Sequence, residues 1–360
     1  MALTRPVKFV VYIVCLFTSM ELLSRMFLAI PPVFDRIVPL RMECDAARRL
    51  RWVDGHTNRK NKFESGYFIY HPTRGWALKP NIHDMKVDNK VLNSNSRGIR
   101  GSAEYSYTKN PDKTRILVLG DSFTFGEEVS DNETYPCNLQ QLLPNTEIIN
   151  FGMPGYGHDQ MLIYLQEEGI KYKPDVVILG FLTQDTTRNM LLFRDYAKPK
   201  FISVHGQLIL VNSPVPSPQE IARSECRKSK FLDLMCILYC KIMMKTKLYD
   251  ERINNLTDAI LCEISATIKR MHATPVFVFL DAQRNIDTVL KIDSPEIKFS
   301  RFCDRSGVVH RIFLRSYFAK AIKDGVILKT TRHFNPQENR IVAQGIGDYL
   351  LAHHLINTTH

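Results

Sequence analysis

Ser122 is the residue whose surroundings in this sequence point most directly to chemistry. It follows an unbroken apolar run, residues 116–119, and then the short sequence Gly120-Asp121. Such a run predicts a fully buried strand, and the carboxyl ends of strands are where open α/β sheets bind their ligands. Ser122 is therefore a candidate nucleophile. The alternative for these residues alone is a glycine turn followed by a serine that caps a helix.

A nucleophilic serine needs a base to remove its proton, a group to orient that base, and donors for the developing oxyanion. Imidazole is the side chain best suited to act as this base at neutral pH. The chain contains 11 histidines, and a surface or core position is the ordinary role of any one of them taken alone. A sequence motif is therefore needed to identify which of these histidines is the base.

Four motifs, in this order, resemble those of the SGNH (GDSL-type) hydrolases, which are esterases and deacylases on a flavodoxin-like sheet. They are Gly120-Asp121-Ser122, residues 150–157 (Asn-Phe-Gly-Met-Pro-Gly-Tyr-Gly), residues 173–180 (Lys-Pro-Asp-Val-Val-Ile-Leu-Gly), and His333-Phe334-Asn335-Pro336 before a terminal helix. The resemblance covers most of residues 65–355. It includes a lead-in, residues 75–81, that is similar to bacterial envelope members of this group.

The resemblance implies a role for several residues. His333 would be the base, and the backbone N–H groups of Ser122 and Gly155 would form the oxyanion hole. The third motif of the family ends in Gly-Asn-Asp, whereas this chain has Thr183-Gln184-Asp185. Gln184 would then supply the amide donor from a side chain longer by one methylene. Pro336 has a structural role, because proline is favoured in the first turn of a helix.

The positions that hold the orienting acid in the family carry different residues in this chain. The family places an aspartate three or two residues before the histidine, and these positions hold Thr330 and Thr331. A threonine hydroxyl accepts a hydrogen bond but has no charge to stabilise an imidazolium. The candidate substitutes are Asp185, Asp304 and Asp324.

Composition limits the class of protein. A chain of 360 residues with 44% hydrophobic content predicts one catalytic domain with extensions. Its net charge of +11 suits an anionic partner such as a membrane surface or an acidic glycan. Nucleic acid is not the expected partner, since the basic residues are spread along the chain without a nucleic-acid-binding motif. The eight scattered cysteines predict neither a metal site nor a disulfide framework, although one incidental disulfide is compatible with export.

The N-terminus predicts a membrane anchor. Arg5 and Lys8 precede an apolar run, residues 9–20, that continues past Glu21 and Arg25, and positive charges before such a run are typical of export signals and anchors. We favour an uncleaved signal anchor over residues 1–32. A cleaved signal and a buried amphipathic helix are the second and third alternatives, because the run is short and Glu21 is costly at mid-bilayer.

The next region, residues 33–110, reads as a connector followed by a β-rich lead-in. The polar and basic stretch from residue 44 to 65 predicts a juxtamembrane connector. Its positive charge argues against placing it outside the cytoplasm, since basic residues favour the cytoplasmic side. Aromatic and turn residues alternate over residues 67–107 and predict short strands packed against the main sheet.

Residues 111–360 alternate strand and helix patterns, which predicts a three-layer α/β fold with a parallel sheet flanked by helices. Strands are predicted near residues 116–119, 147–150, 176–181, 276–280 and 308–310, and helices over 135–143, 160–172, 219–247, 253–272, 315–323 and 336–354. A hairpin is predicted near residues 200–215, inserted over the sheet as a lid. Core packing is the expected use of the helices over 219–247 and 253–272.

These features predict a serine esterase, O-acyl hydrolase or O-acyltransferase that acts on small acyl esters, such as acetyl groups of envelope glycans, through Ser122 and His333. The main domain is expected outside the cytoplasm, membrane-anchored or else secreted, with no cofactor or metal. A degenerate SGNH-fold protein that binds acylated glycan or a protein partner is the alternative. A secreted lipase is a third possibility. The acyl acceptor and the oligomeric state are not determined by the sequence.

Overall fold

The computed structural model describes residues 4–40, 42–58, 66–280, 294–328 and 333–356. Its centre is a parallel sheet of five strands in the order β11-β10-β7-β5-β6. The strands are β5 (Thr114–Gly120), β6 (Thr146–Gly152), β7 (Val176–Phe181), β10 (Thr274–Phe279) and β11 (His310–Phe313). In chain order this is 2-1-3-4-5, the flavodoxin-like arrangement. The α/β fold class predicted from the sequence is confirmed.

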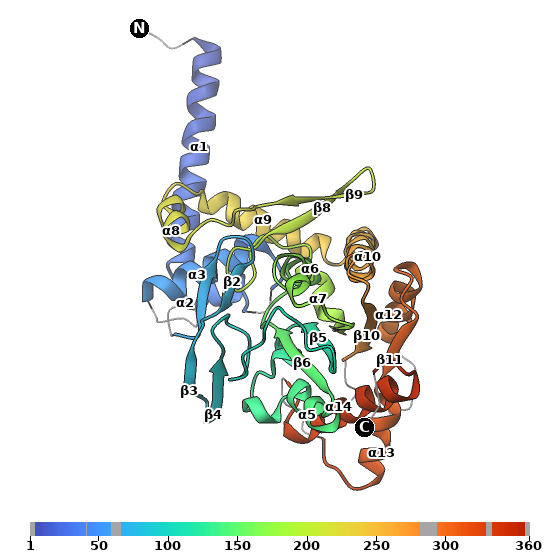
Figure 1. Cartoon of the computed structure of the whole chain (residues 1–360). Coiled ribbons are helices and arrows are strands. Elements are labelled where there is room, and N and C mark those ends of the chain that lie inside the picture. Colours follow the sequence, from blue (N-terminus) through green and yellow to red (C-terminus); the bar gives the residue numbers. More distant parts are fainter. Residues whose placement is uncertain (1–3, 41, 59–65, 281–293, 329–332, 357–360) are drawn as a thin grey trace.

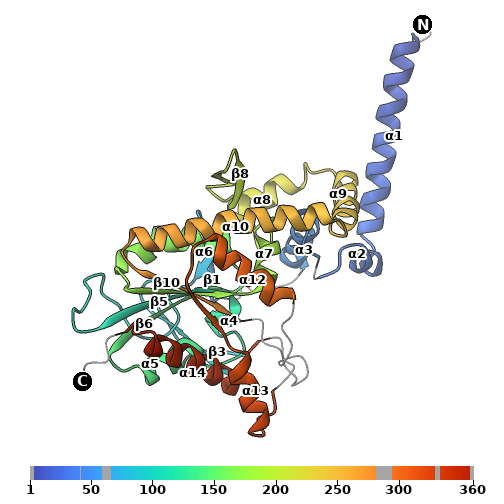
Figure 2. The same cartoon turned by 90° about the vertical axis from the view of Figure 1, so that its right-hand side faces the viewer.

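Helices cover both faces of this sheet, as Figure 2 shows. One face carries α6 (His158–Glu167), α10 (Lys247–Arg270) and α12 (Ser294–Arg305), and the other carries α5 (Tyr135–Leu142), α13 (Arg315–Lys323) and α14 (Pro336–Ala352). Strand β5 serves both layers, since Leu117 and Leu119 belong to the first core and Ile116 and Val118 to the second. This two-sided burial explains why its sequence is apolar without alternation.

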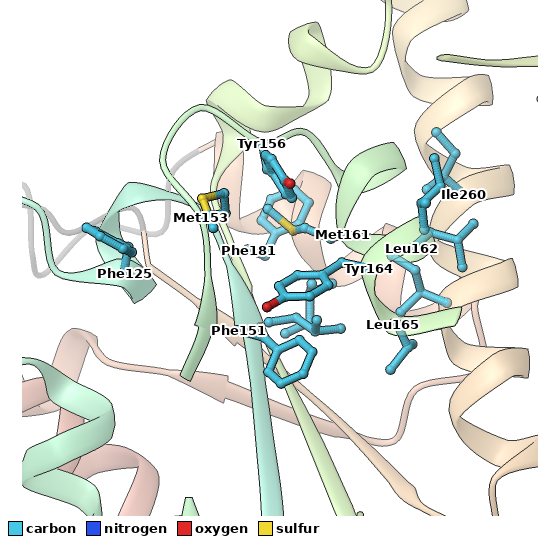
Figure 3. Close-up of a cluster of buried hydrophobic side chains, with 14 of the residues drawn as sticks. Phe125, Phe151, Met153, Tyr156, Met161, Leu162, Tyr164, Leu165, Phe181 and Ile260 are labelled. Atoms are coloured by element: carbon cyan, nitrogen blue, oxygen red, sulfur yellow. The ribbon is translucent and has the colours of Figure 1, made fainter. Parts of the chain in front are cut away.

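The first core is rich in aromatic side chains (Figure 3). Phe151 of β6 packs on Tyr164 of α6 with ring centroids 4.3 Å apart, and Leu165 and Ile260 are buried in the same cluster. Close packing of this kind fixes α6 and α10 against the sheet. The loops at the carboxyl ends of β5, β6 and β7 therefore rest on a rigid base.

A buried histidine begins α6 and makes stability depend on pH. The ring of His158 stacks on Phe181 with centroids 5.1 Å apart. Burial, together with the positive charge of Arg188, lowers the pKa of His158 to about 3. The unfolded chain takes up this proton near pH 6.5, so between the two pKa values the unfolded state binds more protons. The free energy of unfolding should therefore fall as the pH drops below about 6.5, by at most about 1.4 kcal/mol per unit from this residue.

Urea unfolding at pH 7, 6 and 5 tests this expectation. His158→Gln should flatten the pH dependence, whereas the same change at the exposed residue His83 should leave it as in the wild type. Equal slopes for the wild type and His158→Gln would contradict the assignment.

Short elements precede and interrupt the main fold. The lead-in contains two antiparallel pairs, β1 with β2 and β3 with β4, and β8 with β9 forms a hairpin within residues 200–215. Their bounds are β1 (Phe68–His71), β2 (Gly75–Leu78), β3 (Ile82–Val87), β4 (Lys90–Ser94), β8 (Lys200–Val204) and β9 (Gln207–Val211). The remaining short elements of the main fold are α4 (Ser122–Phe125), α7 (Thr183–Arg188), η1 (Asp131–Glu133) and η2 (Gly169–Tyr172).

Among the described residues, one helix is long and apolar enough to cross a membrane. It is α1 (Arg5–Leu28), which projects from the body of the protein (Figure 1). A signal sequence near an N-terminus meets the same criterion. Helices α2 (Pro31–Ile37) and α3 (Asp45–Asn58) follow. The prediction of an unpacked connector is wrong for α3, because its small and apolar side chains Ala47 and Leu50 are buried in a cluster with Ile237.

The predicted helix over residues 219–247 is two helices, α8 (Pro218–Glu225) and α9 (Lys230–Met243). The break occurs because the Ser229 side chain accepts a hydrogen bond from Leu232 N and caps a new helix. The prediction of core packing is confirmed for α10, which buries nine residues. It is wrong for α9, which buries only Asp233 and Ile237.

Candidate active site

Ser122 lies at the first position of α4, immediately after β5. The carboxylate of Asp121 caps this helix and accepts a hydrogen bond from Phe123 N at 2.9 Å. Gly120 is needed here, since a Cβ atom would lie 2.0 Å from Thr124 Oγ1. The turn therefore holds Ser122 at the carboxyl end of β5, which lies between β7 and β6 in the sheet.

Strand β6 supports this turn from one side. Asn150 Nδ2 donates to the carbonyl of Thr124 at 3.0 Å, and Asn150 Oδ1 accepts from Gly152 N at 2.9 Å. Met153 N donates to the carbonyl of Gly120 at 3.0 Å. The asparagine of the second motif thus ties the two loops of the site together.

His333 lies beside Ser122, although 211 positions separate them in the sequence. Its Nε2 is 2.9 Å from Ser122 Oγ. The ring packs edge-on against Phe123 with centroids 5.1 Å apart. Asn335 caps α14 two residues later, with hydrogen bonds from Gln337 N and Glu338 N. The start of α14 therefore fixes where the imidazole can lie.

A glutamate that the sequence did not single out contacts the other imidazole nitrogen. Glu128 Oε1 is 3.0 Å from His333 Nδ1. With a proton on Nδ1, the ring donates to this carboxylate, and the lone pair on Nε2 can accept the Ser122 hydroxyl proton; this tautomer is assigned from the hydrogen-bond partners. A second carboxylate, Glu127 Oε2, lies 3.4 Å from Nε2. Ser122, His333 and Glu128 have the connectivity of a nucleophile, base and orienting acid.

An arginine from the lead-in holds the loop that carries Glu128. The side chain of Arg100 is 4% exposed and donates to the carbonyls of Gly126 and Val129, each at 2.8 Å, and to Asp131 Oδ1 at 2.8 Å. Glu128 itself has φ +75°, a conformation that costs energy for a residue with a side chain. The three bonds from Arg100 offset this cost and fix the glutamate.

The acids considered from the sequence have other surroundings. Asp185 is paired with Arg188, Asp304 with Arg311 and Asp324 with Lys320. Thr330 and Thr331 lie outside the described residues. The available signal for Glu128 was the pair of adjacent glutamates a few residues after Ser122. Such pairs are common on surfaces, so spacing alone could not select it.

A buried ion cluster joins the first and third motifs. Arg188 Nη1 lies 2.9 Å from Asp121 Oδ2 and 2.5 Å from Asp185 Oδ1, and it donates to the carbonyl of Tyr156 at 2.9 Å. Burial alone would lower the pKa of Arg188, but the two carboxylates raise it above its ordinary value. The permanently charged Arg188 therefore holds α7 against the turn that carries Ser122.

The two remaining predicted site residues are Gly155 and Gln184. Gly155 has φ +82°, and a Cβ there would lie 2.2 Å from Asp195 Oδ2. Its loop is held by Trp76 Nε1, which donates to the carbonyl of Pro154 at 2.9 Å. Gln184 is exposed in the first turn of α7. Glycine is thus favoured at position 155 by the backbone conformation, whereas the Asp195 side chain would have to move to admit a Cβ atom.

One cluster within the described ranges has the donor types of a metal site, and it lies on other elements. The thiol sulfurs of Cys44, Cys236 and Cys240 are all within 4.8 Å of one another. Cys44 directly precedes α3, and the other two lie one turn apart on α9. Ser122 and Gln184 lie on other helices, α4 and α7, so this cluster is separate from the candidate active site.

Comparisons with known proteins give the following results. No protein-family model and no curated protein matches the chain. Among solved structures, it is similar to a member of the lipolytic protein G-D-S-L family from Veillonella parvula DSM 2008, with 12% identity, a TM-score of 0.36, and coverage of 66% of this chain and 96% of that one.

Two esterase structures are also similar. One is psychrotrophic esterase EstA from Pseudoalteromonas sp., with 11% identity, a TM-score of 0.39, and coverage of 67% and 99%. The other is a variant of an acetyl xylan esterase from Geobacillus stearothermophilus, with 12% identity, a TM-score of 0.38, and coverage of 68% and 97%.

Proposed function

We propose that this protein is a serine esterase of the SGNH type that hydrolyses or transfers small acyl groups. The observation that carries the proposal is the contiguous chain of contacts from Ser122 Oγ to His333 Nε2 and from His333 Nδ1 to Glu128. Activation of a serine hydroxyl requires a base within hydrogen-bond reach, and the base needs a fixed ring orientation. Both conditions are met by residues from two distant segments of the chain, the stretch after β5 that holds Ser122 and Glu128 and the segment before α14 that holds His333.

The proposed reaction has two halves. Ser122 Oγ attacks the ester carbonyl while its proton passes to His333 Nε2, which gives a tetrahedral oxyanion. The oxyanion collapses, the alcohol leaves with the proton from His333, and an acyl-serine ester remains. Water then attacks that ester and gives a carboxylic acid, whereas an acceptor hydroxyl would give a new ester. Glu128 stabilises the imidazolium that exists during each half.

Donors for the oxyanion come from the same loops. As the first residue of α4, Ser122 has an N–H that precedes the first intrahelical bond, which runs from Phe125 N to the Asp121 carbonyl. We propose that the Gly155 N–H is the second donor and the Gln184 amide the third. The proposed substrate is a small acyl ester, and acetylated envelope glycans are the first candidates.

Labelling with a fluorophosphonate tests the proposal. The reagent should phosphonylate Ser122 in the full-length wild-type protein, and mass spectrometry of the peptide that contains residue 122 should locate the adduct. Ser122→Ala and His333→Ala should remain unlabelled under the same conditions. A wild-type protein that stays unmodified while folded would favour the alternative of a protein that binds acylated glycan without turnover.

Gln184 gives a separate prediction. If its amide donates to the oxyanion, Gln184→Met keeps the length of the side chain but removes the donor, and kcat for ester hydrolysis should fall by about 10²-fold. KM should change little, because the interaction forms mainly in the transition state. A steady-state assay with p-nitrophenyl acetate measures both constants, and unchanged kcat would remove Gln184 from the oxyanion hole.

A further inference from the structure

Helix α9 exposes apolar side chains along most of its length. Leu232, Leu238, Tyr239 and Ile242 are each at least half exposed, and Met235 is 43% exposed. Isolated exposed apolar residues are common, but a contiguous patch on a helix indicates a binding surface. A helix of this kind is costly in water and needs a covering.

Helix α9 is fastened to the candidate membrane span α1. The Glu21 carboxylate accepts hydrogen bonds from Ser229 Oγ at 2.6 Å, Lys230 N at 3.1 Å and Phe231 N at 3.0 Å. Arg25 pairs with Glu21 at 2.7 Å. These contacts cap α9 and compensate the charge of Glu21, so the glutamate no longer argues against a membrane location for this part of α1.

The level of the attachment along α1 decides whether a membrane reaches α9. From Arg5 to Glu21 the helix rises about 24 Å, and over its full length about 36 Å, at 1.5 Å per residue. The hydrocarbon core of a bilayer is about 30 Å thick. A membrane spanned by α1 therefore extends to the depth at which α9 begins. In Figures 1 and 2, α9 lies at the base of α1 and runs across its axis.

Charges and a neighbouring element agree with this placement. Exposed basic residues flank α9, where anionic lipid headgroups would lie; they are Arg223, Arg227, Lys228, Lys245 and Lys247. The hairpin β8–β9 lies on the same side of the body as α1 (Figure 1). Ile202 and its register partner Ile209 are both exposed there.

We propose that α9 lies in the interface of the membrane that α1 spans, with its exposed apolar side chains in the lipid. Lipid is favoured over a second copy of this chain because the apolar surface continues onto α1, whose side chains are exposed from Phe9 to Phe17. The protein is then held at two places, a span and an interfacial helix, and it cannot rotate freely about its anchor.

Tryptophan fluorescence in membranes tests the proposal. Full-length Leu238→Trp and Tyr239→Trp are reconstituted into vesicles of phosphatidylcholine and phosphatidylglycerol, with and without bromine on the acyl chains. The matched control is Val309→Trp, at an 80% exposed residue between α12 and β11. The emission of the two native tryptophans, Trp52 and Trp76, is subtracted with the wild-type protein. We expect blue-shifted emission and at least twofold stronger quenching by brominated lipid at positions 238 and 239 than at 309.

Two outcomes would overturn the proposal. Quenching at 238 and 239 as weak as at 309, with red-shifted emission, would mean that α9 faces water. Blue-shifted emission without bromine quenching would mean that protein covers α9, as in a dimer. Far-ultraviolet circular dichroism establishes that each variant is folded. Tyr239→Trp replaces one aromatic ring by another, so it remains informative if Leu238→Trp is unstable.

Discussion

Ser122→Ala should reduce the turnover of p-nitrophenyl acetate by at least about 10³-fold. The substitution removes the oxygen atom that is proposed to form the acyl-enzyme. His333→Ala should cause a loss of similar size, because a serine hydroxyl without a base 2.9 Å away keeps its proton. The double variant should be no worse than either single one, since the two residues act on the same step.

The measurement is kcat/KM for the full-length protein in detergent. Retained binding of a non-hydrolysable ester analogue by Ser122→Ala would show that the variant keeps its substrate-binding surface. Wild-type rates in Ser122→Ala would refute the proposed nucleophile, and rates that fall only in His333→Ala would assign the histidine to a different reaction.

Glu128→Gln should lower kcat by about 10²-fold. The amide keeps the size of the side chain but can present a donor to His333 Nδ1, which favours the wrong tautomer, and it has no charge for the imidazolium. Loss at a fully buried acid reaches about 10⁴-fold. The Glu128 side chain is 41% exposed, so water can take over part of its role.

Glu127→Gln is the matched control for this prediction. Its carboxylate lies near the same ring but against Nε2, at 3.4 Å, where it does not orient the ring for the serine. It should change kcat by less than about tenfold. Glu128→Asp should recover part of the lost activity, because it restores the charge. Equal effects of the two glutamine variants would mean that only the local negative charge matters, and an unaffected Glu128→Gln would remove the glutamate from the mechanism.

Much of the α/β core could be predicted because its strands are buried on both faces. Val176–Phe181 reads as an apolar run without alternation, and the structure has a strand with these bounds. Proline in the first turn of a helix predicted the start of α14 at Pro336 in the same way. Both signals are local, so one sequence is sufficient to detect them.

The missed features depend on contacts between distant residues. The contact of Glu128 with His333 joins positions 205 apart and requires left-handed backbone at Gly126 and Glu128. No periodic pattern encodes such a pair. The exposure of α9 was missed for another reason: an apolar helix has the same pattern whether it is covered by protein or by lipid. Helix α12 was also missed, although Phe299, Phe302 and Cys303 recur at the spacing of one helix face.

The three bonds from Arg100 make the proposed active site depend on the lead-in. The residue lies before the main sheet begins, yet it determines the shape of the loop that carries Glu128. A descendant that lost the lead-in could retain the sheet, Ser122, His333 and Glu128, but the loop that carries Glu128 would lose its three hydrogen bonds from Arg100. A chimaera that keeps the proposed activity would therefore need the lead-in and the main sheet from the same parent, although the two form separate sheets.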